Sequence, residues 1–237
     1  MASAMTPDTV GHRRTAAHRR GTATSGTRLR RTGLARVPAV PVDELLSRSP
    51  DAWREATAHP FLTGVREGTV PVAAFDTWLV QDARFVADLL RFQARLLARA
   101  PRPAQAVLAG GLVALVEELA WFEQLAAARG LDLAAPALPA TTGYAELLAR
   151  LDDADVPTGL TALWTIERTY LDAWSGALPG APQYREFVEH WTVPGFAGYV
   201  AGLAAAADAF PPADPDAVFA EVVAAEIVFW DMAMGAA

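Results

Sequence analysis

The 237-residue sequence contains no cysteine, no lysine and only four histidines, and these shortages exclude several kinds of chemistry. Without cysteine there is no disulfide, no thiolate metal ligand and no cysteine nucleophile. Four histidines leave little material for a histidine-rich metal site. We therefore expect a protein that works with neither a metal nor another cofactor.

The sequence also lacks a long apolar run. No uninterrupted stretch reaches the roughly 18–20 residues that span a bilayer, so we expect no membrane partner and a cytoplasmic protein. Residues 1–36 hold eight arginines and one acid, and no apolar segment follows them as in a secretion signal. We expect residues 1–37 to be a disordered arginine-rich tail and residues 38–237 to form one helical domain.

Positive charge is scarce in the rest of the chain. From residue 37 onward, 26 acids accompany only 12 arginines. A strongly acidic surface repels phosphate backbones. We therefore expect a small-molecule partner and no nucleic acid.

Apolar residues recur at helical spacing from Val37 onward, and no segment alternates with the period of two that marks a strand. This pattern predicts an all-α fold, a multi-helix antiparallel bundle of seven or eight helices. Phe61–Val70 contains two glycines and is expected to be a turn-rich connection. The helices are expected at about residues 41–58, 71–100, 103–129, 141–151, 157–177, 183–191, 195–210 and 214–234.

Four of these helices each carry one acid in the middle of an apolar, aromatic-rich stripe. These acids are Asp82, Glu118, Glu167 and Glu226. A single buried carboxylate costs several kcal/mol unless a partner satisfies it, and one such residue is common in structural ion pairs. Four are more than a plain bundle core needs. If the four faces converge, they enclose an acid-lined aromatic pocket suited to a small molecule.

Two chemistries use carboxylates clustered on helices. A di-iron or di-manganese centre needs histidines three residues after two of the acids, but those positions hold Phe85, Trp121, Tyr170 and Phe229. The other chemistry is recognition of a nitrogen-rich planar ligand, whose ring stacks on aromatic side chains while carboxylates accept its amine hydrogens. Burial raises the pKa of a glutamate toward neutrality, which suits proton transfer. Without a thiol, water is the expected nucleophile.

Several short motifs, taken in order, resemble those of the TenA/thiaminase II family, which has the haem-oxygenase-like all-helical fold. The resemblance covers about residues 42–234. Its motifs are His59-Pro60-Phe61, Leu79-Val80-Gln81-Asp82, Glu117-Glu118-Leu119-Ala120, Pro182-x-Tyr184 leading to Trp191, and Glu226-x-x-Phe229-Trp230-x-Met232-Ala233.

The resemblance implies that Asp82 binds the aminopyrimidine of a substrate and that Glu226 is the catalytic acid/base. It also implies a substrate-binding wall, whose further members are Phe85, Glu118, Tyr144, Tyr170 and Trp191. Phe85 and Trp191 stand where the family usually has tyrosines, so stacking is kept without the hydroxyls. The histidine that follows Glu118 by four residues in many members is Phe122 here.

The main departure from the family pattern concerns the nucleophile. Thiaminase members carry a cysteine four residues before the tyrosine matched by Tyr170, and that position is Ile166 here. The chain therefore resembles the cysteine-less branch, associated with salvage of degraded thiamin. There, a formylaminopyrimidine is deformylated, or an aminomethylpyrimidine is hydrolysed to hydroxymethylpyrimidine and ammonia. We predict that Glu226 protonates the leaving amine and that Glu226 or Glu167 activates water.

Two other classes stay open: a non-catalytic pyrimidine-binding or regulatory protein, and a metal-dependent or cofactorless oxidase of the same fold. Because family members generally form dimers or tetramers, we also expect a homo-oligomer.

Structural roles are the competing interpretation for several of these residues. Glu167 could pair with an arginine, and the candidates are Arg84, Arg91, Arg95 and Arg168. Most tryptophans are expected to fill the core, namely Trp78, Trp121, Trp164, Trp174 and Trp230.

Overall fold

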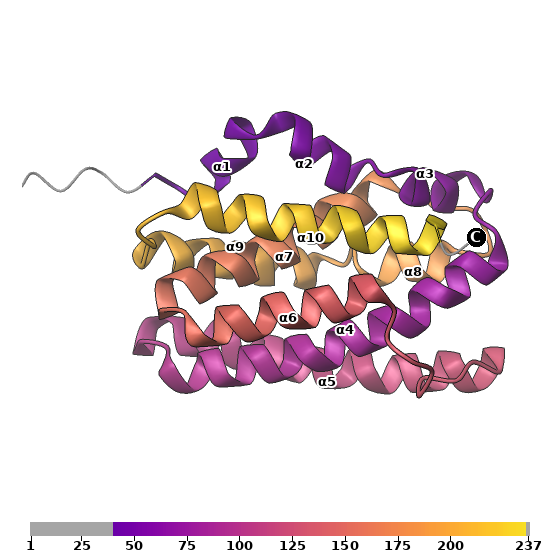
Figure 1. Cartoon of the computed structure of the whole chain (residues 1–237), viewed down its shortest axis with the longest axis horizontal. Coiled ribbons are helices and arrows are strands. Elements are labelled where there is room, and N and C mark those ends of the chain that lie inside the picture. Colours follow the sequence, from indigo (N-terminus) through magenta and orange to yellow (C-terminus); the bar gives the residue numbers. More distant parts are fainter. Residues whose placement is uncertain (1–39, 236–237) are drawn as a thin grey trace, which may run out of the picture. The chain divides into compact units, whose positions relative to one another are not determined.

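A computed structural model describes residues 40–235 of the chain (Figure 1), so the expected tail at residues 1–37 lies outside the described residues. Residues 40–235 form helices and no strand, which confirms the all-α expectation. The helices are α1 (Asp43–Arg48), α2 (Pro50–Thr57), α3 (Pro60–Glu67), α4 (Val72–Arg99), α5 (Arg102–Arg129), α6 (Pro139–Asp153), α7 (Val156–Gly176), α8 (Arg185–His190), α9 (Pro194–Ala209) and α10 (Pro215–Gly235).

Two local predictions near the start of the domain were wrong. The expected first helix is divided into α1 and α2, because Ser49 leaves the helical conformation and Pro50 begins a new helix. The stretch expected to be a turn-rich connection instead forms α3. The side chain of His59 caps α3 by accepting a hydrogen bond from the Phe61 backbone N–H at 3.2 Å. Gly68 ends α3 in the left-handed conformation, with φ of 75°.

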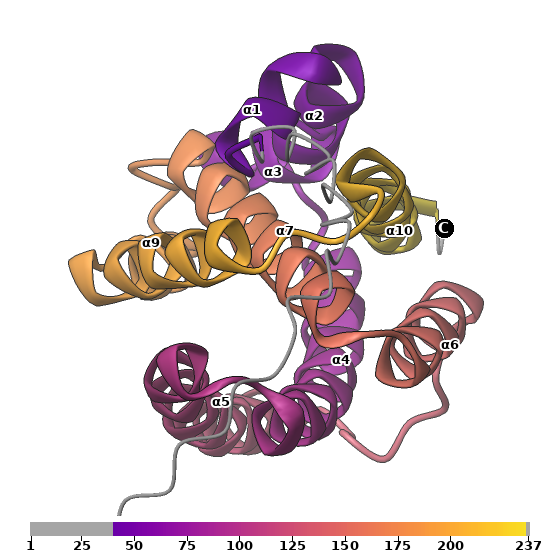
Figure 2. The same cartoon turned by 90° about the vertical axis from the view of Figure 1, so that its left-hand side faces the viewer.

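The long helix α7 is the central element of the domain. It packs most extensively on α9 and α10 and also contacts α2, α4 and α6, while α4 packs along α5 and α6 (Figure 2). Because α7 is surrounded, its polar side chains must find partners inside the protein. The hydroxyls of Thr165 and Thr169 donate to backbone carbonyls one turn earlier, at 2.9 and 2.8 Å. Glu167 and Tyr170 have no such backbone partner and face a cavity described below.

A buried amide fixes the start of α6. The Gln81 side chain of α4 accepts hydrogen bonds from the Leu138 backbone N–H at 2.9 Å and the Thr141 hydroxyl at 2.7 Å. It also donates to the Pro136 carbonyl at 3.1 Å. These three bonds hold the first turn of α6 against α4 and so set the position of Tyr144, which lies in the next turn.

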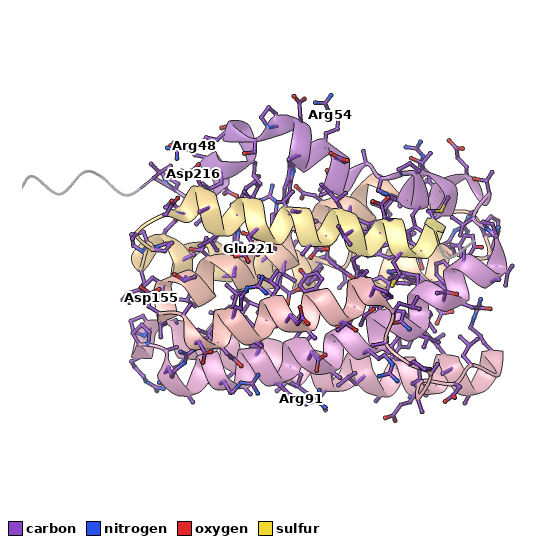
Figure 3. The ribbon with its side chains drawn as sticks, viewed as in Figure 1. Arg48, Arg54, Arg91, Asp155, Asp216 and Glu221 are labelled. Carbon is purple, nitrogen blue, oxygen red and sulfur yellow. The ribbon has the colours of Figure 1, made fainter. Side chains whose placement is uncertain are left out.

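Exposed ion pairs join neighbouring helices at the surface (Figure 3). Arg48 of α1 contacts Asp216 of α10 at 2.7 Å, and Arg150 of α6 contacts Glu221 of α10 at 2.6 Å. Such exposed pairs contribute about 0–1 kcal/mol each. Packing of apolar side chains therefore supplies most of the stability of these contacts.

Helix α5 is long and apolar enough to cross a membrane, judged by length and composition alone. One such helix is weak evidence for a membrane span, and 22% of its most apolar 18-residue window is buried inside the protein. In this chain α5 packs along α4 and carries Glu117 and Glu118 near its middle.

Candidate active site

A cavity of about 660 Å³ lies between α4, α5, α7 and α9, with the end of α8 closing one side. Figure 2 looks roughly along these long helices and shows α5 and α9 on one side of α7. The exposed rim consists of Gly110, Ala114 and Glu117 of α5 together with Val193 and Gly195. The polar and aromatic residues of the wall are Phe85, Glu117, Glu118, Trp121, Glu167, Tyr170, His190, Trp191, Phe196 and Tyr199.

Eight residues were predicted to form the site. In the structure some of them lie on the cavity wall and the others are buried behind it. Five line the cavity, namely Phe85, Glu118, Glu167, Tyr170 and Trp191. The other three do not line it: Asp82 and Glu226 are 0% exposed and Tyr144 is 2% exposed. Asp82 is bonded to Tyr170 and Tyr144 packs on Phe85, both of which line the cavity, whereas Glu226 is connected to the wall only through Tyr144.

Two carboxylate–tyrosine pairs form this deeper layer. The Tyr170 hydroxyl donates a hydrogen bond to Asp82 Oδ1. The Tyr144 hydroxyl donates to Glu226 Oε1 at 2.5 Å. In both pairs the second carboxylate oxygen, Asp82 Oδ2 or Glu226 Oε2, is buried without a hydrogen-bond partner. Each carboxylate therefore keeps an acceptor that no protein group uses.

Burial shifts the titration of both carboxylates. It raises the pKa of Glu226 to about 8, although the hydrogen bond from Tyr144 opposes the shift. Burial also raises the pKa of Asp82 well above its usual range, against the Tyr170 hydrogen bond and with help from the negative charges of Glu118 and Glu226. At neutral pH Glu226 therefore holds a proton that it can donate.

Phe85 stacks between the two tyrosines and links the deeper layer to the cavity. Its ring centroid lies 4.5 Å from that of Tyr144, at an interplanar angle of 56°. It lies 6.0 Å from that of Tyr170, at 19°. Because Phe85 and Tyr170 both line the cavity, a planar ligand in it would meet aromatic surface next to the buried carboxylates.

The two predicted acids on the cavity wall have different surroundings. Glu118 accepts a hydrogen bond from the Trp191 indole N–H at 2.7 Å, and burial raises its pKa to about 7. Glu167 is 7% exposed. Its pKa is raised well above the usual range by burial and by the charges of Glu118 and Glu226, while a hydrogen bond with Tyr199 opposes the shift.

The structure does not support the arginine-pairing alternative for Glu167. Arg91 pairs with Asp88, Arg95 with Asp152, and Arg168 with Asp43 and Asp172. Among residues 40–235, no arginine forms an ion pair with any of the four predicted acids. Uncompensated buried carboxylates are typical of functional sites rather than of plain cores.

Five polar or aromatic residues of the wall were not predicted to be part of the site, and Phe196 is one of them. Trp121, expected in the core, lines the cavity, whereas the other four tryptophans expected in the core are fully buried there. Glu117, His190 and Tyr199 also line the cavity. The aromatic pair Phe196 and Tyr199, on a helix otherwise rich in alanine and glycine, is the sequence signal that could have identified the α9 wall.

A chain of polar contacts fixes Tyr199. Its hydroxyl donates to Gln93 Oε1 at 3.0 Å, and Gln93 Nε2 donates to the Leu108 carbonyl at 2.8 Å. These bonds link α9, α4 and α5 behind the wall. Within the described residues, no group of three or more His, Asp or Glu side chains is arranged to hold a metal ion.

The helices and the cavity define the class of the protein: an all-α protein of the haem-oxygenase-like fold with a cavity lined by acidic and aromatic side chains. Its family follows from the sequence. The TENA/THI-4/PQQC family model matches residues 47–236, and the chain belongs to this family.

Known relatives cover most of the chain. It is 30% identical over 203 residues to a Glycine max protein named "Probable bifunctional TENA-E protein", across 77% of this chain and 88% of that protein. The structure of a TenA homologue from Pyrococcus furiosus has a TM-score of 0.77 and 29% identity, covering 82% of this chain and all of that one. A Sulfolobus solfataricus protein described as a "putative tena-like thiaminase" has a TM-score of 0.75 at 19% identity, covering 83% and 97% of the two chains.

Proposed function

We propose that this protein is a hydrolase of thiamin salvage that uses water to cleave the exocyclic C–N bond of an aminopyrimidine. The observation that carries the proposal is the pair of buried carboxylates, Asp82 and Glu226, each with one unpartnered oxygen. Leaving such an oxygen unsatisfied costs about 1–3 kcal/mol. An amine of a ligand would remove that cost, because its N–H can donate to Asp82 Oδ2 and its nitrogen can accept from the protonated Glu226 carboxyl, so these oxygens favour an amine-bearing ligand.

The names of two relatives support thiamin chemistry. The Sulfolobus solfataricus protein is called thiaminase-like, and the Glycine max protein is called a TENA-E protein. The residues of this chain limit which reaction mechanisms are possible. Ile166 occupies the position of the thiaminase cysteine and lines the cavity, and the whole chain lacks cysteine. A covalent thioether route is therefore excluded, and water is the nucleophile.

Glu226 is the proposed acid and base. Because its pKa is raised to about 8, the carboxyl is protonated at neutral pH and can give its proton to the departing amine. The resulting carboxylate then takes a proton from the attacking water, whose oxygen bonds to the methylene carbon. The products are hydroxymethylpyrimidine and ammonia. The Tyr144 hydrogen bond holds the carboxyl in place during both transfers.

The other residues bind and orient the ring. Asp82 would accept from the ring amine through Oδ2, its unpartnered oxygen. Phe85, Tyr170 and Trp191 supply aromatic surface on the cavity wall. Glu167 is the second candidate to activate water, because it lines the cavity and no arginine neutralises it.

Ammonia release from aminomethylpyrimidine by Glu226→Gln tests the proposal. Glutamine still accepts the Tyr144 hydrogen bond but cannot transfer a proton, so we expect kcat to fall by about 10²- to 10⁴-fold. Glu221→Gln, an exposed change on the same helix, is the matched control and should leave kcat unchanged. An unimpaired Glu226→Gln variant would refute the catalytic role.

Further assays of the same purified protein distinguish a hydrolase from a non-catalytic binding protein and from an oxidase. A pyrimidine-binding protein without catalytic activity would bind the ligand and release no ammonia from it. An oxidase would consume oxygen, and a metal-dependent one would contain stoichiometric metal on elemental analysis. Either result would replace the hydrolase proposal.

A further inference from the structure

A second hollow, of about 270 Å³, lies between α4 and α5, next to the loop that joins α5 to α6. It shares no lining residue with the large cavity described above. On α4 it is lined by residues between Ala83 and Arg91, whereas Phe85, Val86 and Leu89 line the large cavity. At about 3.6 residues per turn these two sets face opposite sides of α4, so the hollow is separate from the cavity.

Arg84 supplies an unused cation at this hollow. It is partly buried, and its Nε–H is fully buried without a hydrogen-bond partner. Arg129 and Arg168, whose side chains are also mostly buried, each pair with an acid. Among residues 40–235, no acid forms an ion pair with Arg84. Because a guanidinium stays protonated, Arg84 cannot relieve its burial by losing a proton.

The acids that line the hollow do not neutralise Arg84. Asp88 lies one helical turn after it, but Asp88 pairs with Arg91 at 2.7 Å, at the outer surface of α4 (Figure 3). Glu123 lines the hollow from α5, is exposed, and forms no ion pair within the described residues. Of the four charged groups, two therefore cancel as a pair, and one cation and one anion are left on different helices.

This charge pattern is complementary to a zwitterion. A carboxylate accepts two parallel hydrogen bonds from a guanidinium, so the carboxylate of a ligand can satisfy the unused donors of Arg84. An ammonium group on the same ligand can donate to Glu123. A phosphate dianion suits the hollow less well, because Asp88 and Glu123 both line it and repel a second negative charge.

The rest of the lining is suited to an apolar group. Leu119 and Phe122 of α5 and Leu133 of the following loop contribute side chains to the hollow. Leu119 and Leu133 are only partly buried, so a ligand that covers them removes apolar surface from water.

We propose that this hollow binds a small zwitterion with an apolar body, of the class of the aliphatic α-amino acids. Arg84 binds the carboxylate, Glu123 binds the ammonium group, and the leucines together with Phe122 contact the side chain. The inference does not rest on the proposed function, because none of these residues takes part in the hydrolysis described above.

A chemical-shift titration of the full-length, ¹⁵N-labelled protein with L-leucine tests the assignment. The Nε–H of Arg84 has no protein partner, so its resonance should shift in a saturable manner when a carboxylate binds. The indole N–H of Trp191, on the wall of the large cavity, should keep its resonance. Isopentylamine lacks the carboxylate of leucine and 4-methylpentanoate lacks its ammonium group, so both should bind more weakly than leucine.

Variants assign the binding to the hollow. Arg84→Gln should raise the Kd for leucine by about 10- to 100-fold, since it removes a charge-assisted bidentate contact. Glu123→Gln should raise it by about 2- to 5-fold, because Glu123 is exposed. Arg99→Gln changes an exposed arginine of the same helix that bonds to the Ala154 carbonyl, and it should leave the Kd unchanged. Ala87→Phe fills the hollow and keeps Arg84, which provides a second variant if Arg84→Gln does not fold.

Four results would overturn the inference. The first is the absence of a saturable shift at Arg84 in the wild type. The second is an unchanged Kd in both Arg84→Gln and Ala87→Phe. The third is binding of 4-methylpentanoate or isopentylamine as tight as that of leucine, which would exclude a zwitterion site. The fourth is a changed oligomeric state of Arg84→Gln on size-exclusion chromatography, since the guanidinium would then bind a second copy of the chain rather than a small molecule.

Discussion

The buried acids of this protein are held by neutral hydrogen-bond donors rather than by cations. Tyr170 donates a hydrogen bond to Asp82, Tyr144 donates one to Glu226, and the Trp191 indole N–H donates one to Glu118. A guanidinium would hold each carboxyl in its ionised form and lower its pKa. A hydroxyl or an indole N–H offsets burial only in part, so the pKa of each acid stays raised, to about 7 for Glu118 and about 8 for Glu226. The choice of partner residue therefore turns a group of carboxylates into a source of protons.

Stability should fall as pH rises, because of these raised pKa values. In the unfolded chain the Glu226 carboxyl has its ordinary pKa of 4.5, whereas in the folded protein its pKa is about 8. Between these values the unfolded state binds fewer protons, so the free energy of unfolding decreases with pH. Since one pKa unit is worth about 1.4 kcal/mol, Glu226 alone should contribute a change on the order of a few kcal/mol. Urea unfolding at pH 5 and pH 8 measures this difference.

Variants isolate the contribution of Glu226. Glu226→Gln removes the titrating group and keeps the acceptor for Tyr144, so its stability should depend less on pH than that of the wild type. Glu55→Gln changes an exposed acid on α2 and should leave the pH dependence as it is. Equal pH dependence in the wild type and Glu226→Gln would show that Glu226 does not hold its proton in the folded state.

Sequence alone could identify the acids of the site but not all of its wall. Asp82 and Glu226 stand out because each interrupts an apolar stripe on its own helix, which is a local signal. His190 carries no such signal. His190 ends a helix of only six residues, and its position beside Glu118 depends on how α8 packs against α5. Contacts between segments 72 residues apart follow from tertiary packing, which periodicity does not report.

At the scale of helices, periodicity predicted the long elements and the short helix α8, but it missed α3 and the break between α1 and α2. α4, α5, α7 and α10 lie within a few residues of their expected bounds, because each spans several turns with a repeated apolar face. α3 has only eight residues, and its two glycines were interpreted as turn signals. In the structure Gly68 is a helix cap, while Gly64 packs inside the helix, where an added Cβ would lie 2.6 Å from Val70 Cγ2.

Helices α4, α5 and α9 approach so closely at Gly111 that no larger residue fits there. An added Cβ would lie 2.3 Å from Gln93 Nε2 and 2.4 Å from the Tyr199 hydroxyl oxygen. Gly111→Ala must therefore displace the Gln93–Tyr199 hydrogen bond behind the cavity. We expect a loss of about 1–3 kcal/mol in the free energy of unfolding, as in other overpacked sites.

The adjacent glycine provides the matched control. Gly110 lies in the same helix, and an added Cβ there meets no atom within 4 Å. Gly110→Ala should therefore stabilise the protein by about 0.5–1 kcal/mol, the usual gain from replacing a helical glycine. Denaturant titration of both variants measures the contrast. If Gly111→Ala proved as stable as Gly110→Ala, the three helices would not be in the tight contact described here.

At the scale of the whole molecule, the cavity wall resembles the described domain in carrying more acidic than basic side chains. Its wall holds Glu117, Glu118 and Glu167, and no arginine is among the lining residues that the structure describes. Several arginines of the surrounding helices pair with other acids, such as Arg91 of α4 with Asp88 and Arg168 of α7 with Asp43 and Asp172. A ligand entering the cavity therefore meets a negative or neutral wall, which favours cationic or amine-bearing compounds over phosphorylated ones.

Thermal unfolding with and without ligand tests this charge selection. At a ligand concentration of 100 Kd, binding adds about 2.7 kcal/mol of stability. For a domain of this size that corresponds to a rise in Tm of about 5–11 °C. We expect such a rise with aminomethylpyrimidine and little or none with the phosphate ester of hydroxymethylpyrimidine at the same concentration. The contrast should widen from pH 6 to pH 8, because Glu118, with a pKa of about 7, becomes ionised over that interval. Inorganic phosphate alone controls for general anion effects. A larger rise with the phosphate ester than with the amine would mean that a cationic group outside the wall described here governs binding, and the charge argument would fail.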